Sequence, residues 1–248
     1  EYMKKTISII SGTLNRKENV KRLIENTIEK YNFLELVLVD GGSTDGTIEY
    51  IESLNYENLI FVNYGKRSSY PHFMNLGILN SSGEFICIWD DDAVLINSWT
   101  EVLSILEEQK FDFYIFNWKL GDDISSINNP EWIKGNDDSN DWCLFDKTGE
   151  ASDGIVTMNY GIFNRKVFSE IGMHNIRFDF WYADNDLSNR AHLFGYKHKS
   201  LRDIKVFVKN TEKNRKYRKK DLKIFQSNLK KYRKKKLPRG IEYLKNMN

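Results

Sequence analysis

Three consecutive acidic residues, Asp90, Asp91 and Asp92, come directly after an apolar run of strand length. Neighbouring carboxylates repel one another, and a bound divalent cation would relieve that repulsion. Hard cations such as Mg²⁺ and Mn²⁺ take carboxylate oxygens together with substrate phosphates. The cluster therefore predicts a cation site that neutralises a phosphate-containing leaving group. A solvated acidic turn is the structural alternative for an isolated run of this kind.

Two further polar turns lie earlier in the chain. Asp40 closes a second apolar run and is followed by the sequence GGSTDG. Its carboxylate could accept hydrogen bonds from a base or a ribose, and the glycines would allow a ligand to approach closely. The simpler interpretation is a helix cap supplied by a Ser, Thr or Asp of the same turn. The first apolar run ends in a third such turn, with the sequence GTLNR at residues 12–16.

The residues between these turns predict alternating strands and helices. Apolar runs predict strands at residues 6–11, 34–39, 59–63, 84–89 and 113–118. Helical spacing of apolar residues predicts helices at 17–30, from 48, around 75–77 and after Ser98, which forms a capping box with Glu101. This order implies an α/β fold with a mostly parallel, Rossmann-like central sheet flanked by helices. Ligands bind at the carboxyl ends of such strands, so we expect all three polar turns on one rim.

The second half of the chain is less regular. Residues 121–149 are rich in Asp, Asn and Ser, and we expect a lid or an acceptor-side insertion there. Order returns at 155–164 and in a helix over 184–194 that Gly195 would close. A last helix over 214–236 would carry its apolar residues on one face.

The composition is that of a globular protein, with 40% hydrophobic and 29% charged residues among 248. No apolar run approaches the ~20 residues that span a bilayer. Two cysteines, Cys87 and Cys143, are too few for a disulfide framework. We therefore expect a cytoplasmic protein.

The net charge of +2 conceals a strongly basic C-terminal segment. Residues 213–239 contain 14 Lys and Arg against one acid, Asp221, a local charge of +13 that leaves the remaining residues at −11. A basic amphipathic helix could lie on an anionic membrane surface, which would make the protein peripheral on the inner face. The same charges could bind nucleic acid, or the helix could pack on the acidic body of the protein.

Five motifs in order make the chain similar to the family 2 glycosyltransferases, which have the GT-A fold. They are GTLNR at 12–16, VDGGSTDGT at 39–47, MNLG at 74–77 with GEFI at 83–86, DDD at 90–92, and ADNDLSNR at 183–190 with GY at 195–196. The resemblance runs from about residue 6 to residue 196.

This resemblance implies an inverting transfer of a sugar from a nucleotide sugar, by default a UDP-sugar, to an acceptor hydroxyl. It implies Mn²⁺ or Mg²⁺ as cofactor, with Asp92 and Asp90 as metal ligands. It also implies that Asp184 is the general base, although Asp184 could be a helix N-cap as well. The donor-binding residues that it implies are Thr13, Asn15, Asp40, Asn75, Asp90 and Asp91.

The chain departs from the family pattern at three positions, where Gly41, Met74 and Ala183 replace the usual Asp, Arg and Glu. Because the missing arginine often contacts the nucleotide, we expect Arg67 or Lys66 to take over that contact. On the acceptor side, Trp142 and Trp181 could stack on a sugar ring, or they could be ordinary core residues. Tyr160 precedes the helix at 166–171, where acceptors bind in many members of the family.

We expect a GT-A domain over residues 3–210, divided into a nucleotide-sugar-binding half at 3–118 and an acceptor-side half at 119–210. A basic helical tail would follow at 211–248. The partners expected are a nucleotide-sugar donor and a carbohydrate or lipid-linked acceptor, in surface polysaccharide or glycolipid synthesis. Three alternatives stay open: a nucleotidyltransferase, a DNA-modifying sugar transferase, and a sugar-binding module that has lost catalysis.

Overall fold

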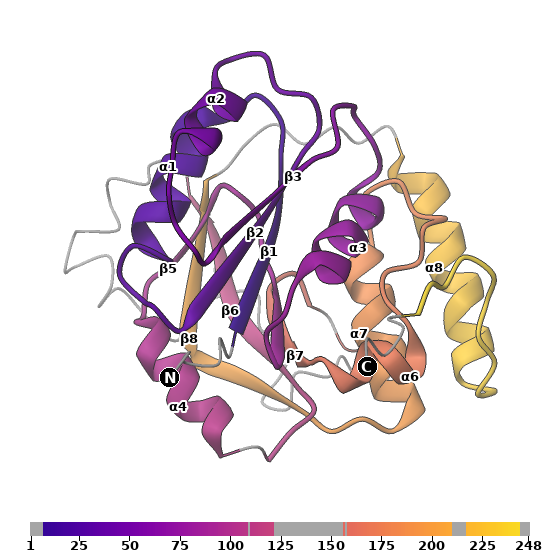
Figure 1. Ribbon diagram of the computed structural model, residues 1–248. Coiled ribbons are helices and arrows are strands. Elements are labelled where there is room, and N and C mark those ends of the chain that lie inside the picture. The colour runs from indigo at the N-terminus through magenta and orange to yellow at the C-terminus, as the bar shows by residue number, and fades with distance from the viewer. Residues whose placement is uncertain (1–6, 109, 122–155, 157, 210–216, 244–248) are drawn as a thin grey trace.

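The computed structural model describes residues 7–108, 110–121, 156, 158–209 and 217–243. Within these residues an eight-stranded sheet has the strand order β3-β2-β1-β4-β7-β6-β8-β5 (Figure 1). The strands are β1 (Ile7–Thr13), β2 (Leu34–Asp40), β3 (Leu59–Asn63), β4 (Phe85–Ile88), β5 (Ala93–Leu95), β6 (Phe113–Gly121), β7 (Gly161–Asn164) and β8 (His198–Lys209).

The N-terminal half of the sheet is parallel, as its alternation of strands and helices predicts. β1 pairs in parallel with β2 and with β4, and β2 pairs in parallel with β3. The C-terminal half is mixed, because β7 lies between β4 and β6 and is antiparallel to both. β6 and β8 are again parallel, whereas the short edge strand β5 is antiparallel to β8. The expected Rossmann-like GT-A architecture is thus confirmed.

Helices cover both faces of the sheet (Figure 1). They are α1 (Lys17–Asn26), α2 (Thr47–Glu52), α3 (Tyr70–Asn80), α4 (Trp99–Glu107), α6 (Lys166–Ile171), α7 (Ala183–Phe194) and α8 (Arg218–Tyr232). Alternate strand residues enter different cores: Ile9 packs with apolar residues of α1, α2 and α4, whereas Ile10 packs with those of α3, α6 and α7. Because both faces of the central strands are buried, their sequences are continuously apolar.

Several boundaries differ from the predictions. The helix predicted over 17–30 ends at Asn26, where the Thr27 hydroxyl donates a hydrogen bond back to the Leu23 carbonyl oxygen at 2.6 Å. The sequence does not predict β5 and β8, since β5 has only three residues and β8 mixes apolar and charged side chains without regular alternation. The predicted helix starts at Ser98 and near Asp184 are confirmed, and Gly195 closes α7 at a φ of 100°.

The C-terminal helix α8 packs on α7 at the outside of the molecule (Figure 1). Phe225, Leu229 and Tyr232 of α8 form a small apolar cluster with Phe178 and Ala183. The helix therefore contacts the body of the protein across the predicted boundary at residue 211. Among the described residues no helix has the length and apolar character needed to cross a membrane.

Candidate functional site

The three polar turns of the sequence lie on one rim of the sheet. Thr13 and Asp40, the last residues of β1 and β2, are register partners in the parallel ladder. The acidic triad follows β4, the other parallel neighbour of β1, and the Ala93 N–H closes its turn by donating to the Asp90 carbonyl oxygen at 3.1 Å. The rim borders a cleft of about 820 Å³. Its described lining consists of Gly12, Thr13, Leu14, Arg16, Arg67, Ser68, Ser69, Tyr70, Phe73, Met74, Asp90, Asp91, Asp92, Asp179, Phe180 and Tyr217.

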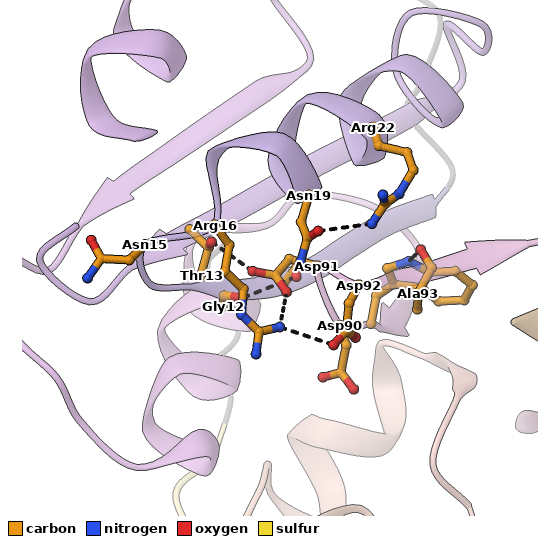
Figure 2. Close-up of polar contacts among 12 residues, drawn as sticks. Gly12, Thr13, Asn15, Arg16, Asn19, Arg22, Asp90, Asp91, Asp92 and Ala93 are labelled. Atoms are coloured by element: carbon orange, nitrogen blue, oxygen red, sulfur yellow. Dashed lines mark hydrogen bonds and ion pairs between the residues drawn. The ribbon is translucent and has the colours of Figure 1, made fainter. Parts of the chain in front are cut away.

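Asp91 is held from two sides inside this cleft (Figure 2). The Thr13 hydroxyl donates to Asp91 Oδ2 at 2.8 Å, and one guanidinium nitrogen of Arg16 donates to Asp91 Oδ1 at 2.9 Å. The same nitrogen donates to Asp92 Oδ2 at 3.0 Å. Arg16, the last residue of the GTLNR motif, therefore bridges two residues of the triad, a role that the sequence does not predict.

Burial and charge act against each other at this bridge. Asp91 is 4% exposed, and burial, with a smaller contribution from Asp92, raises the pKa of its carboxyl even though Arg16 and Thr13 favour the charged form. Burial alone would lower the pKa of Arg16, but Asp91 and Asp92 outweigh it and the pKa is raised. The guanidinium is thus the positive charge that keeps two buried carboxylates together.

The triad has the chemistry of a cation site, although no cluster of three or more metal-ligating side chains occurs among the described residues. Carboxylate oxygens suit Mg²⁺ or Mn²⁺, and such ions often use one or two carboxylates together with substrate phosphates. Asp92 shares its Oδ2 with Arg16, and Asp90 Oδ2 accepts a hydrogen bond from the Tyr160 hydroxyl at 2.7 Å. Asp90 and Asp92 could together offer carboxylate oxygens to such a cation, which would then compete with Arg16 for Asp92 Oδ2.

Asp40 is fully buried behind the rim and holds the following loop. Its Oδ1 accepts from the N–H groups of Gly42 and Ser43 at 2.7 and 2.8 Å, and its Oδ2 accepts from the Ser43 hydroxyl at 2.5 Å. Gly42 has a φ of 91°, and a Cβ there would lie 2.8 Å from the Gly65 carbonyl oxygen. Asn15 connects this loop to the β1 turn, because its Oδ1 accepts from the Thr44 N–H at 2.7 Å.

Asn75 is likewise buried and pairs with the backbone of His174. Its side-chain amide donates to the His174 carbonyl oxygen at 2.9 Å and accepts from the His174 N–H at 3.0 Å. Asn15, Asp40 and Asn75 thus shape the loops around the cleft, whereas Thr13, Arg67 and the triad line it.

Asp184 lies in the first turn of α7 and is held by two aromatic side chains. The Tyr70 hydroxyl donates to its Oδ1 and Oδ2 at 3.0 and 3.1 Å, and His174 Nε2 lies 2.8 Å from Oδ1. Asp184 is 18% exposed, and Tyr70, not Asp184, is among the described residues that line the cleft. Burial, Asp184 and Asp90 raise the pKa of Tyr70 well above its usual value. The predicted base is therefore connected to the cleft by its hydrogen bonds with the Tyr70 hydroxyl.

Sequence reasoning did not find Tyr70 or a role for His174. Tyr70 starts α3, 114 positions before Asp184, and Pro71 after it marks only a helix start. His174 is fully buried and its Nδ1 has no hydrogen-bond partner in the described structure. Neither lies in a motif that spacing would single out.

The acceptor-side predictions fall in three different places. Tyr160 is buried and contacts the triad through Asp90. Trp181 lies in the loop before α7, with the guanidinium of Arg218 5.4 Å from the centre of its ring. Trp142 lies outside the described residues, as does most of the insertion predicted at 121–149.

Solved structures resemble this fold. TarS from S. aureus, residues 1–349 in complex with UDP, is 18% identical at a TM-score of 0.62, and the match covers 83% of this chain and 61% of that one. The same TarS fragment with UDP-GlcNAc is 19% identical at 0.61, over 84% and 60%. The mannosyltransferase PcManGT from Pyrobaculum calidifontis, with GDP-Man and Mn²⁺, is 18% identical at 0.57, over 92% and 62%. The chain thus spans about 60% of the length of these chains, and at such identities the likeness shows the fold.

No curated protein matches the sequence significantly. Residues 8–172, in contrast, match the model of glycosyl transferase family 2. This segment starts in β1 and contains the polar turns, Arg16, Tyr70 and the acidic triad, and it ends just after α6. Because the match covers more than half of the 248 residues, the chain belongs to glycosyl transferase family 2.

Proposed function

We propose that this protein transfers a sugar from a nucleoside diphosphate sugar to an acceptor hydroxyl, with inversion at the anomeric carbon. The observation that carries the proposal is that one cleft is lined both by the acidic triad and by Tyr70, whose hydroxyl is bonded to Asp184. A site for a charged leaving group and a site for proton removal thus open into the same space. Membership of the family supports the same reaction.

The donor would lie along the β1 and β4 side of the cleft. We place Thr13, Arg67, Asp90 and Asp91 in contact with it, and Asn15, Asp40 and Asn75 behind them as residues that hold the loops. UDP-sugars are the default donors, since TarS binds UDP and UDP-GlcNAc, and GDP-Man bound to PcManGT makes a GDP-sugar the second choice.

Asp92, together with Asp90, would hold Mn²⁺ or Mg²⁺, and the ion would supply positive charge to the diphosphate as it leaves. Arg16 would add a second, permanent positive charge at the same end of the donor. PcManGT was solved with Mn²⁺, which supports a divalent ion in a structurally similar protein.

Proton removal would take place on the Tyr70 side. The acceptor oxygen attacks the anomeric carbon while the bond from that carbon to the diphosphate oxygen breaks, and the electron pair leaves with the diphosphate. The acceptor proton passes to the Tyr70 oxygen as Tyr70 gives its own proton to Asp184. A single displacement of this kind inverts the anomeric configuration.

The acceptor is a carbohydrate or a lipid-linked carbohydrate in this proposal. Its sugar ring would stack on aromatic side chains at the cleft, of which Phe180 is 43% exposed.

Ten Lys and Arg between residues 218 and 239 are exposed, whereas the single acid of that segment, Asp221, is buried. This surface fits an anionic membrane, and with it a cytoplasmic enzyme that is peripheral on the inner face.

Calorimetric titration with UDP, GDP and dTDP in the presence of Mn²⁺ tests the donor site. One nucleotide should bind, and its binding should weaken strongly with EDTA and in Asp92→Asn. Asp112→Asn is a suitable control, because Asp112 pairs with Lys166 and lies at the opposite edge of the sheet from the triad. Its carbonyl oxygen accepts from Asn164, the register partner of the first residue of β4, whereas the triad follows the last. Lack of binding by every nucleotide would contradict the donor site and favour a binding module without catalysis.

A further inference from the structure

Three successive backbone N–H groups of the loop before α7 converge on one buried carboxylate of α8. Asp221 Oδ1 accepts from Asp179 at 3.2 Å, and Oδ2 accepts from Phe180 and Trp181 at 3.0 and 2.9 Å. Asp221 is fully buried. Since a buried charge is costly unless it is hydrogen-bonded, these three bonds account for a lone acid in a basic helix.

The loop that Asp221 holds is also in contact with the proton-removal side of the cleft. The Tyr70 N–H donates to the Asp179 carbonyl oxygen at 3.0 Å, and the rings of Tyr70 and Phe180 meet edge to face with their centres 5.6 Å apart. Asp179 and Phe180 themselves line the cleft. A direct chain of contacts therefore runs from Asp221 through this loop to Tyr70 and from Tyr70 to Asp184.

A second part of α8 fixes α7 just beyond Asp184. Asn228 and the Tyr232 hydroxyl each donate to a different oxygen of Asp186, both at 2.8 Å, and Asp186 is fully buried. Between the two contact points, the rings of Tyr182 and Phe225 stack with their centres 5.5 Å apart. Side chains of α8 thus contact the chain on both sides of Asp184, at residues 179–182 and at residue 186.

We infer that Asp221 is a positioning residue for the transfer reaction and that α8 is a working part of the site, not a detachable basic tail. The inference rests on the proposed function only in that it takes Tyr70 and Asp184 as the residues that must be positioned. The hydrogen bonds by which Asp221 holds the loop, called the brace below, are a property of the fold. Misplacement of a reacting group by about 1 Å can cost on the order of a hundredfold in rate, so loss of the brace should be visible in turnover.

Hydrogen exchange of the unmodified protein tests the brace without any assumption about activity. The amides of Asp179, Phe180 and Trp181 should exchange as slowly as those in the middle of α7, although they belong to a loop. In Asp221→Asn one of the two acceptor oxygens becomes an N–H₂ group, so at least one of the three backbone N–H groups loses its acceptor. Exchange at one or more of the amides of Asp179, Phe180 and Trp181 should therefore accelerate at least tenfold in this variant. Rapid exchange at these amides in the unmodified protein would overturn the inference, whether or not the variant folds.

Turnover then separates positioning from general stability. In Asp221→Asn, release of nucleoside diphosphate from the nucleotide sugar, counted per nucleotide-binding site, should fall on the order of ten- to a hundredfold. The donor Kd should stay within twofold, because no described contact joins α8 to Thr13, Arg16 or the triad. Gln226→Ala, at an exposed position of the same helix that carries no charge, should change neither quantity. If Asp221→Asn turns over within twofold of the unmodified protein per nucleotide-binding site, the inference is overturned. If the unmodified protein binds no nucleotide at all, the proposed function is refuted instead. The exchange experiment still decides in that case whether Asp221 holds the loop.

Discussion

The Tyr70 hydroxyl donates to both carboxylate oxygens of Asp184, at 3.0 and 3.1 Å. Tyr70 lines the cleft that contains the acidic triad, so it stands between the predicted base and that cleft. His174 holds the same carboxylate from the buried side through Nε2 at 2.8 Å. Asp184 is therefore fixed in orientation before any substrate binds, as a base in a displacement reaction requires.

Removal of the Tyr70 hydroxyl should separate donor binding from proton transfer. In Tyr70→Phe, turnover should fall on the order of a hundredfold, since the bridge between the acceptor hydroxyl and Asp184 is lost. Donor affinity, measured by calorimetry, should stay within twofold. Tyr56→Phe removes a hydroxyl that bonds Glu29 away from the cleft and serves as the control. Unchanged turnover in Tyr70→Phe would show that the proton takes another route.

Arg16 and a divalent ion should compete for Asp92. Arg16→Gln removes the guanidinium that bridges Asp91 and Asp92, so Mn²⁺ should bind more tightly to the variant than to the unmodified protein. Nucleotide binding in EDTA should weaken, because a permanent positive charge is lost. Arg22→Gln is the matched control, because the side-chain hydrogen bond of Arg22 in the described structure is to Asn19 on the same helix. Identical Mn²⁺ titrations for the unmodified protein and Arg16→Gln would contradict the competition.

The charge of Asp91 should destabilise the fold at neutral pH. Burial, with Asp92, raises the pKa of this carboxyl, so the folded chain binds its proton more tightly than the unfolded chain does. The destabilisation is fully present above the folded-state pKa, declines as the pH falls below that value, and is gone below the lower pKa of the unfolded chain. Asp91→Asn should therefore have a higher Tm than the unmodified protein at pH 7.5, and the difference should shrink toward acidic pH.

Asp45 provides a control of opposite sign. Burial acts to raise its pKa, but hydrogen bonds from Thr47 and the Lys17 N–H lower it, so its charged form stabilises the fold. Asp45→Asn should accordingly have a lower Tm at pH 7.5. A Tm of Asp91→Asn below that of the unmodified protein at pH 7.5, with a deficit that shrinks toward acidic pH, would show that the bridge to Arg16 outweighs the burial.

The exposed face of α8 should bind anionic lipid. Lys219, Lys223 and Lys230 lie on the side opposite its buried residues, and each contributes about 1 kcal/mol near such a surface. Their joint replacement by Gln should weaken binding to phosphatidylserine vesicles on the order of a hundredfold in cosedimentation. The same replacement at three exposed lysines elsewhere, Lys30, Lys110 and Lys199, is the control. Tight binding to duplex DNA with none to vesicles would favour nucleic acid as the partner.

The rim of the site could be predicted from the sequence because its cause is local. Each of the three turns follows an apolar run, and parallel strands bring their carboxyl ends together, so Thr13 and Asp40 meet at one edge. The mixed half of the sheet could not be predicted in this way. Order is predicted at 155–164, but no local signal says that β7 lies between β4 and β6 and is antiparallel to both.

Long-range polar partners were also beyond the reach of the sequence. Asp221 stands out as the single acid of a basic segment, but the backbone N–H groups that donate to it lie about 40 positions earlier in the chain. Because the donors are backbone groups, their side chains do not identify them in the sequence. Asp40 was expected to contact a base, whereas its carboxylate is occupied by the loop that follows it. The residue type showed that a polar contact exists, and only the tertiary structure shows which contact it is.

Analysis of the sugar product by NMR tests the central claim most directly. The protein would be incubated with Mn²⁺ and a nucleotide sugar of known anomeric configuration, with water as the acceptor, in parallel with Asp184→Asn. The account predicts nucleoside diphosphate and an initial product of inverted configuration, at a rate that falls in Asp184→Asn by about 10² to 10⁴. A product of retained configuration, or sugar phosphate with nucleoside monophosphate in place of the diphosphate, would contradict it.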